Sequence, residues 1–263
     1  PLAGLVQLAL LWWSAIKSGL HISLRKPSFA PDMRQLFKVA IPAALTNGVV
    51  QINLLVGTIV ASFFPGAVSW LYGADRLYQL PLGVVGIAVG IVLLPELSKR
   101  IQSGDSEGAR LAFSRANEVS FALSFPAAVA LFVIPLPLVS ALFEHGATSR
   151  SDAAAMAQAC TIYALGLPAF VLQKVLQPLY FAKEDTKTPF RFALFAMVVN
   201  AALAIGLMDV LGWVAPAIAA TASSWVMVGF LTNGMRQYGS MAEIGAEGRQ
   251  RLIRIALAAL GMG

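Results

Sequence analysis

The sequence predicts an all-α protein that crosses a membrane several times, and three observations carry this prediction. Hydrophobic residues make up 58% of the 263 residues, and the mean hydropathy is +0.74. Charged residues make up only 12%, about half the share found in soluble domains. The charges are also clustered, which leaves uncharged stretches of about 20 residues, the length of a transmembrane helix. Soluble, disordered, coiled-coil and disulfide-stabilised proteins are therefore excluded.

Each predicted span is an uncharged stretch that ends at charged residues. In chain order, these stretches are 1–16 before Lys17, about 39–63 within the uncharged stretch 39–74, 77–95 between Arg76 and Glu96, 119–143 between Glu118 and Glu144, 153–182 interrupted by Lys174, 192–208 before Asp209, and 210–235 before Arg236. They do not alternate polar and apolar residues as membrane β-strands do, so helices are expected. Another apolar segment begins near Leu252, and the chain is expected to be a fragment of a longer protein.

Basic residues are concentrated in the segments between alternate spans. Residues 17–38, 96–118, 183–191 and 236–263 hold 16 of the 19 lysines and arginines. Such segments lie in the cytoplasm by the positive-inside rule. We therefore expect four parts: the end of a truncated helix at 1–16, a cytoplasmic loop at 17–38, six helices over 39–235, and a cytoplasmic linker with the start of a further helix at 236–263.

The same topology explains the net charge of +6, so no nucleic-acid partner is expected. The single cysteine, Cys160, allows no internal disulfide, and His21 and His145 form no metal-ligand pattern. No motif for nucleotide, zinc or Ser/His/Asp chemistry is present, so neither a catalytic residue nor a metal site is predicted.

Loops and caps are also predicted. Asp105 or Ser106 is expected to cap a short helix within residues 96–118. Thr188 is expected to cap a helix that begins with Pro189. Aromatic anchors are expected where the helices leave the membrane on its outer face, at Trp70, Tyr72 and Trp213.

Proline and glycine patterns point to helix bending and packing. Eleven of the 14 prolines lie in spans or at their ends, which suits either a bundle that moves or ordinary packing of kinked helices. Gly83, Gly86 and Gly90 form a face of small residues on which another helix is expected to pack closely.

Two cations break the loop pattern and are the candidate binding residues. Arg76 follows Asp75 at the expected outer start of the helix over 77–95. It either reaches the interface with Asp75 as its counter-charge, or it forms an anion site, because a guanidinium matches phosphate oxygens.

Lys174 interrupts a span and shares a helix face with Gln177, three residues later. A polar face within a span is expected to point into the bundle. Asn53 and Asn200 are further amides within spans, for which a hydrogen bond between helices is the commoner role.

Two segments resemble the MurJ (MviN) lipid II flippase family, which belongs to the multidrug/oligosaccharidyl-lipid/polysaccharide exporter superfamily. They are INLLVGTIVASFFPGAVSWLYGADRLYQLPLGVVGIAVGIVLLPELSK, from Ile52 to Lys99, and GLPAFVLQKVLQPLYFAKEDTKTPFR, from Gly166 to Arg191. The resemblance implies two six-helix lobes, as in MATE transporters, around a cationic cavity. It also implies movement of undecaprenyl-pyrophosphate-linked peptidoglycan precursor (lipid II) across the bacterial inner membrane.

On this resemblance, residues 39–235 correspond to the C-terminal lobe, and the N-terminal lobe is missing from the sequence. Arg76 corresponds to the family's functional cavity arginine, and Lys174 to a family lysine. Many relatives carry an acidic residue where this chain has Gly57, and the resemblance implies that some of them bind sodium through acid and amide groups on the seventh, eleventh and twelfth helices. With Gly57 in this position, a sodium site is not expected. No cofactor is implied, and coupling to the membrane potential or to an ion stays open.

Three other functions stay open. A drug or polysaccharide exporter of the same superfamily would carry acidic cation sites upstream. A membrane-embedded prenyl or glycosyl transferase would need paired acids, whereas Asp75 and Asp209 are unpaired in the sequence. A scaffold subunit would tolerate neutral substitutions at both Arg76 and Lys174.

Overall fold

The computed structural model describes residues 2–18, 48–49, 51–242 and 246–261. The chain divides into two units, residues 1–45 and 46–263, which are treated separately. In the first unit, α1 (Leu2–Lys17) forms the helix expected at the start of the chain. Most of the predicted 17–38 loop and the beginning of the predicted 39–63 span lie outside the described residues.

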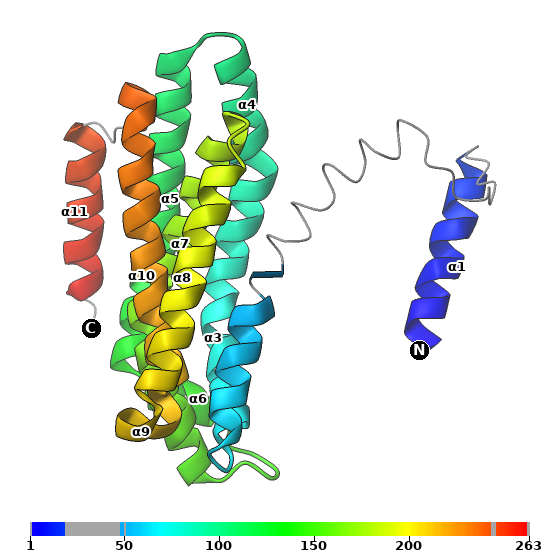
Figure 1. Cartoon of the computed structure of the whole chain (residues 1–263), viewed down its shortest axis with the longest axis vertical. Coiled ribbons are helices and arrows are strands. Elements are labelled where there is room, and N and C mark those ends of the chain that lie inside the picture. Colours follow the sequence, from blue (N-terminus) through cyan, green and yellow to red (C-terminus); the bar gives the residue numbers. More distant parts are fainter. Residues whose placement is uncertain (1, 19–47, 50, 243–245, 262–263) are drawn as a thin grey trace. The chain divides into compact units, whose positions relative to one another are not determined.

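The described part of the second unit is a bundle of long helices (Figure 1). In chain order its elements are the helix Gln51–Ser62, α3 (Ala67–Ala88), the π-helical η1 (Val89–Leu93), α4 (Leu94–Gln102), α5 (Ser106–Val133), α6 (Pro135–Phe143), α7 (Arg150–Ala182), α8 (Lys187–Gly206), α9 (Met208–Leu211), η2 (Gly212–Val214), α10 (Ala215–Met235), η3 (Arg236–Ala242) and α11 (Ala246–Leu260). No strand occurs among these residues, so the all-α prediction is confirmed.

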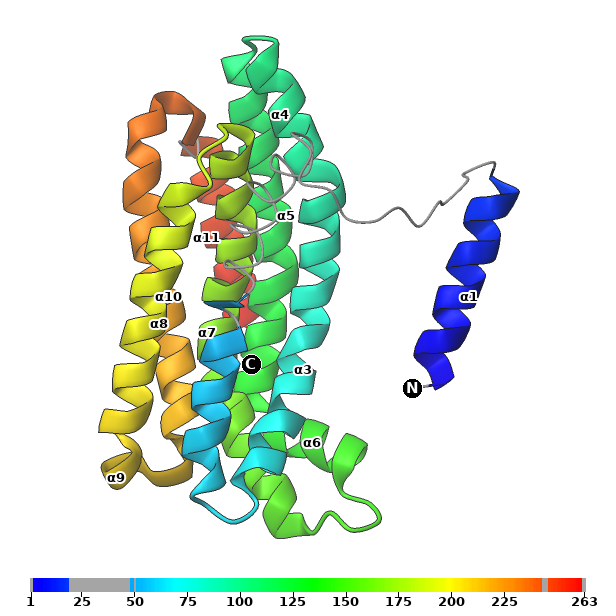
Figure 2. The ribbon, with the colours of Figure 1, turned by 45° about the vertical axis from the view of Figure 1, so that its right-hand side comes forward.

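Four helical segments are long and apolar enough to cross a membrane. They are Ser106–Val133, Arg150–Ala182, Lys187–Gly206 and Met208–Gly239. Figures 1 and 2 show α5, α7, α8 and α10 running side by side along the long axis of this unit. The predicted spans at 153–182, 192–208 and 210–235 therefore fall on this bundle, with shifted ends. The predicted span at 119–143 is not one helix, because the chain breaks at Ile134 between α5 and α6.

The connections alternate between the two ends of the bundle. The α4–α5 turn, the α7–α8 turn and η3 lie at the upper end in Figure 1, and these are the basic segments that the sequence places together. Residues 63–66, residues 144–149 and α9 lie at the lower end. The structure thus brings the described basic segments to one end, as a single membrane orientation requires.

The helix predicted at 77–95 is longer than expected at both ends. It begins at Ala67 and continues through η1 and α4 to Gln102. Asp75 and Arg76 therefore lie two turns inside the helix rather than at its start, which corrects the prediction. Trp70 ties the first turn of this helix to its neighbours: its indole Nε1–H donates to Asp152 Oδ1 over 2.8 Å, and its ring packs edge-on against Trp213.

Two cap predictions need correction in detail. Asp105 does cap a helix, accepting a hydrogen bond from the Gly108 backbone N–H, but that helix is the 28-residue α5 rather than a short one. Thr188 does not cap α8, which begins at Lys187. Asp185 takes this role, because its Oδ1 accepts the Thr188 backbone N–H at 3.0 Å.

The core is built around α7, which packs against α3, α5, α6 and α10. Gly166 of α7 lies at a close helix contact, where an added Cβ would lie 2.9 Å from Thr221 Oγ1 of α10 and 2.9 Å from a ring carbon of Phe170 on α7 itself. An added Cβ at Gly83 or Gly86 would meet nothing within 4 Å. Within the described chain, the close contact predicted at those two glycines is therefore absent.

Candidate functional site

A cavity of about 470 Å³ lies within the bundle, between the helix Gln51–Ser62 and helices α3, α7, α8 and α10. Its lining mixes apolar side chains with hydroxyl and amide groups. The polar side chains are Asn53, Thr58, Tyr72, Asp75, Tyr78, Tyr163, Gln173, Lys174, Gln177, Asn200, Ser223 and Ser224. Among the described residues, Asp75 and Lys174 are the charged side chains that line it, so this lobe does not make the cavity cationic by itself.

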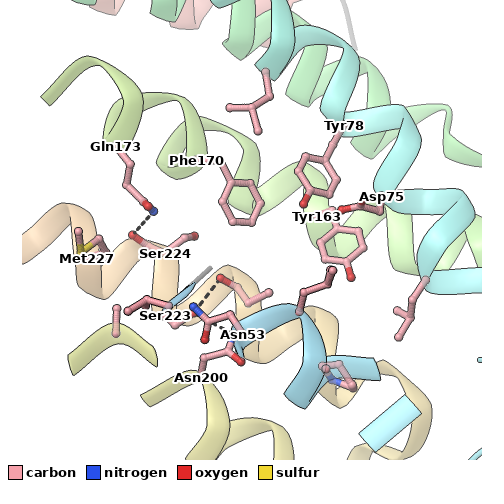
Figure 3. Close-up of a pocket in the computed structure, with 18 of the residues that line it drawn as sticks. Asn53, Asp75, Tyr78, Tyr163, Phe170, Gln173, Asn200, Ser223, Ser224 and Met227 are labelled. Carbon is pink, nitrogen blue, oxygen red and sulfur yellow. Dashed lines mark hydrogen bonds between the residues drawn. The ribbon is translucent and has the colours of Figure 1, made fainter. Parts of the chain in front are cut away.

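One part of the cavity wall carries amides and hydroxyls (Figure 3). The buried Asn200 donates from Nδ2 to Ser223 Oγ at 3.2 Å, and this bond joins α8 to α10. Gln173 of α7 donates from Nε2 to the Ser224 backbone oxygen at 3.1 Å. Asn53 Oδ1 is buried and accepts no hydrogen bond from a described residue. A buried acceptor of this kind favours a bound hydrogen-bond donor.

Another part of the wall is aromatic and surrounds Asp75. Tyr78 stacks on Phe170 with ring centroids 5.1 Å apart and packs against Tyr163 at 4.9 Å. Asp75 is partly buried beside these rings (Figure 3). Its carboxylate interacts with the Tyr78 hydroxyl through a side-chain hydrogen bond and accepts another from Gln79 Nε2. The rings thus hold this carboxylate at the cavity wall.

The four predicted binding residues are divided between this cavity and the adjoining surface. Asp75, Lys174 and Gln177 all line the cavity, which brings together residues from α3 and α7. Arg76 is exposed and is not part of the lining. Its guanidinium lies over the ring of Tyr72, which does line the cavity, with Cζ 4.4 Å from the ring centroid.

Arg76 and Asp75 do not pair with each other. No ion pair within 4.0 Å joins them in the described structure. Instead, Arg76 donates from a terminal nitrogen to the Tyr72 hydroxyl, whereas Asp75 bonds to Tyr78 and Gln79. Asp75 and Arg76 therefore interact as neighbouring charges without forming a direct ion pair.

Gly57, the position on which the sodium expectation rests, lines the cavity and contributes no side-chain oxygen. Asn200 uses its amide nitrogen to bond Ser223, which leaves its amide oxygen outside that bond. No group of three His, Cys, Asp or Glu side chains able to hold a metal occurs in the part of the chain that the structure describes.

Sequence reasoning missed the tyrosines of the site. Tyr72 was expected to be an interfacial anchor, yet it lines the cavity and contacts Arg76. The spacing of four between Tyr72 and Arg76 places both on one helix face, and this spacing could have revealed the contact. Nothing local marks Tyr163 as part of the site, because tertiary packing brings it to Tyr78.

A bundle of membrane-length helices with a partly polar interior cavity defines a multi-pass membrane protein of the class that includes transporters. The family model "Lipid II flippase MurJ" matches residues 2–261. The chain therefore belongs to the MurJ family, whose members are multi-pass proteins of the bacterial inner membrane, and the four long apolar segments agree with this location.

Individual relatives support the same family. The "Probable lipid II flippase MurJ" of Rhizobium tropici is 45% identical over 85% of this chain and 42% of its own length. The solved structure "Lipid II flippase MurJ, inward closed conformation" matches 96% of this chain and 52% of its own, with TM-score 0.77 and 27% identity. A MATE structure in complex with MaL6 matches with TM-score 0.60 and 19% identity, which shows a shared fold. The chain spans about half the length of these relatives.

Proposed function

We propose that this chain is one lobe of a flippase that moves lipid II, the undecaprenyl-pyrophosphate-linked peptidoglycan precursor, across the bacterial inner membrane. The observation that carries the proposal is the family match over residues 2–261, together with a partly polar cavity inside a membrane bundle. The rest of a longer protein would supply the second lobe, since the chain spans 42% of the Rhizobium tropici relative.

The lobe offers separate chemistry for the charged and uncharged parts of such a headgroup. Lys174 lines the cavity, and Arg76 lies beside it. Both are cations and suit the pyrophosphate. The amides and hydroxyls around Asn53, Gln177 and Asn200 suit the sugar and peptide. The prenyl tail stays in the lipid, where apolar surface carries no desolvation cost. Asp75 keeps the Tyr78 ring in place at the wall.

Flipping forms and breaks no covalent bond, so the proposal needs neither a catalytic residue nor a cofactor. The lobe would rock against its partner lobe and expose the cavity to each leaflet in turn. This reading is favoured over a transferase because Asp75 is the single acid among the described cavity residues. It is favoured over a drug exporter because the match to MATE proteins, at 19% identity, extends to the fold alone.

The test is complementation in cells depleted of their own lipid II flippase, with the complete gene that encodes this chain. Arg76→Ala is expected to reduce growth and lipid II translocation strongly, because loss of a charge-assisted hydrogen bond costs about 1.5–3 kcal/mol, roughly a 10- to 150-fold loss of affinity. Arg76→Lys keeps the charge and is expected to retain part of the activity.

The matched control is Arg115→Ala, which removes another exposed arginine far along the chain, on α5. It is expected to support normal growth. If Arg76→Ala supports normal growth and translocation at normal protein levels, the assigned role of Arg76 is wrong.

A further inference from the structure

The surroundings of Arg76 carry an inference about a second residue. Tyr72 and Arg76 lie one turn apart on α3, so their side chains share one face of the helix. The Arg76 guanidinium lies over the Tyr72 ring, with Cζ 4.4 Å from the ring centroid. A terminal nitrogen of Arg76 also donates to the Tyr72 hydroxyl. Tyr72 thus holds the arginine through both its face and its hydroxyl.

Tyr72 is placed between the exposed arginine and the cavity. It is 57% exposed and is also part of the cavity lining. Tyr72 therefore keeps Arg76 at the rim of the cavity, although Arg76 itself is not part of the lining. No carboxylate among the described residues lies within ion-pair distance of Arg76, so its charge remains available to an anion.

Stacking on a ring suits an arginine that must bind phosphate oxygens. The ring occupies one flat face of the guanidinium, while N–H groups along its edge stay free for a bidentate contact. A free arginine side chain loses rotamer entropy when it binds a ligand, and a side chain already held by a neighbour loses less. The contact therefore prepares Arg76 for an anion before the anion arrives.

We propose that Tyr72 is a positioning residue that orients Arg76 at the cavity rim for the pyrophosphate of the lipid substrate. This inference rests on the proposed function and adds a residue to the site. Tyr72 acts through Arg76, so substitutions at Tyr72 weaken anion binding only while the arginine is present.

The experiment is a double-mutant cycle on the complete protein, purified in detergent. The measured quantity is the dissociation constant of radiolabelled farnesyl pyrophosphate, which carries a prenyl chain and a pyrophosphate. Tyr72→Leu removes ring and hydroxyl, and Tyr72→Phe removes the hydroxyl alone. Each is made with Arg76 present and in the Arg76→Ala background. Leu80→Ala is the control, since Leu80 is an exposed residue four positions after Arg76 on the same helix.

With Arg76 present, Tyr72→Leu is expected to weaken binding about two- to fivefold, the effect of one cation–π contact. Tyr72→Phe keeps the ring and is expected to fall between Tyr72→Leu and the unaltered protein. In the Arg76→Ala background, Tyr72→Leu is expected to change nothing. Leu80→Ala is expected to bind normally, and all variants should unfold at the temperature of the unaltered protein.

The outcomes separate the two claims. If Arg76→Ala binds normally, the proposed anion site at Arg76 fails. If Arg76→Ala weakens binding but Tyr72→Leu has no effect, the site stands and the role of Tyr72 is overturned. An equal loss from Tyr72→Leu in both backgrounds also overturns it, because Tyr72 would then act on the ligand directly.

Discussion

At the scale of single residues, the adjacent and oppositely charged Asp75 and Arg76 of α3 lie in different surroundings. Successive residues of an α-helix point about 100° apart, and this is enough to turn Asp75 to the cavity and Arg76 to the surface. Each finds a tyrosine: Tyr78 for the acid and Tyr72 for the base. The two charges are neighbours without a direct ion pair, and each has its own hydrogen-bond partner on the helix.

A second acid, Asp185, stabilises the basic end of the bundle. It joins the start of α8 to η3, because it accepts the Thr188 backbone N–H at 3.0 Å and the Tyr238 hydroxyl at 3.0 Å. Burial by itself raises the pKa of Asp185, but the hydrogen bonds from Thr188 and Tyr238 outweigh it and hold the pKa below its usual value.

The direction of this shift sets a pH dependence. A carboxyl with a lowered folded-state pKa stabilises the protein above its unfolded pKa of about 3.9 and loses that contribution as the pH falls through the folded value. Asp185→Asn is therefore expected to lower the unfolding temperature in detergent at pH 7, and the difference from the unaltered protein should shrink below about pH 4. A difference that stays constant to pH 3 would contradict this role.

The residues of the site differ in how far the sequence could predict them. Lys174, Gln177 and Asp75 are conspicuous because charge and amide groups are rare in spans, and all three line the cavity. The tyrosines of the site do not stand out in the same way, because tyrosine is an ordinary residue in membrane-spanning helices. Tyr163 reaches Asp75 only because α7 packs against α3, and no local pattern encodes that contact.

At the scale of helices, composition predicted the existence of elements better than their ends. Uncharged stretches locate α7 and α10, but charge did not stop α5, which includes Glu107 and Arg110 in its first turns. The reason is that the charges pair along the helix: Arg110 bonds to Glu107 at 2.5 Å, and they lie three residues apart. A charged segment can thus be a helix end rather than a loop.

Helix packing gives a test that separates two glycines. Gly166→Ala is expected to destabilise the protein by about 1–3 kcal/mol, because the new Cβ would lie 2.9 Å from Thr221 Oγ1 and from the Phe170 ring. Gly86→Ala places a Cβ in open space and is expected to be neutral or stabilising by up to about 1 kcal/mol. Unfolding temperatures of the two variants in detergent check this order. The reverse order would show that Gly86, rather than Gly166, is a helix contact.

At the scale of the whole molecule, the orientation in the membrane can be tested directly. Cys160 is the one cysteine in these 263 residues, and it is buried, so replacing it and every cysteine in the rest of the complete protein with alanine gives a background for single cysteines. In that background, Ala147→Cys is expected to react with a membrane-impermeant maleimide in intact cells. Ser103→Cys is expected to react only after the inner membrane is opened. Both positions are exposed, and they lie at opposite ends of the bundle. The opposite labelling would reverse the orientation given by the basic loops.

The continuous rod formed by α3, η1 and α4 has a mechanical consequence. Its 36 residues span roughly 50 Å at 1.5 Å per residue, whereas the hydrocarbon core is only about 30 Å thick. Part of this helix therefore extends beyond the lipid, and the charged end near Lys99 and Arg100, where Glu96 pairs with Arg100 at 2.6 Å, is the part that suits water. A tilt of the rod about the bilayer midplane moves this tip farther than it moves Asp75 or Arg76. A probe attached at the tip would consequently report the motion of the cavity in amplified form.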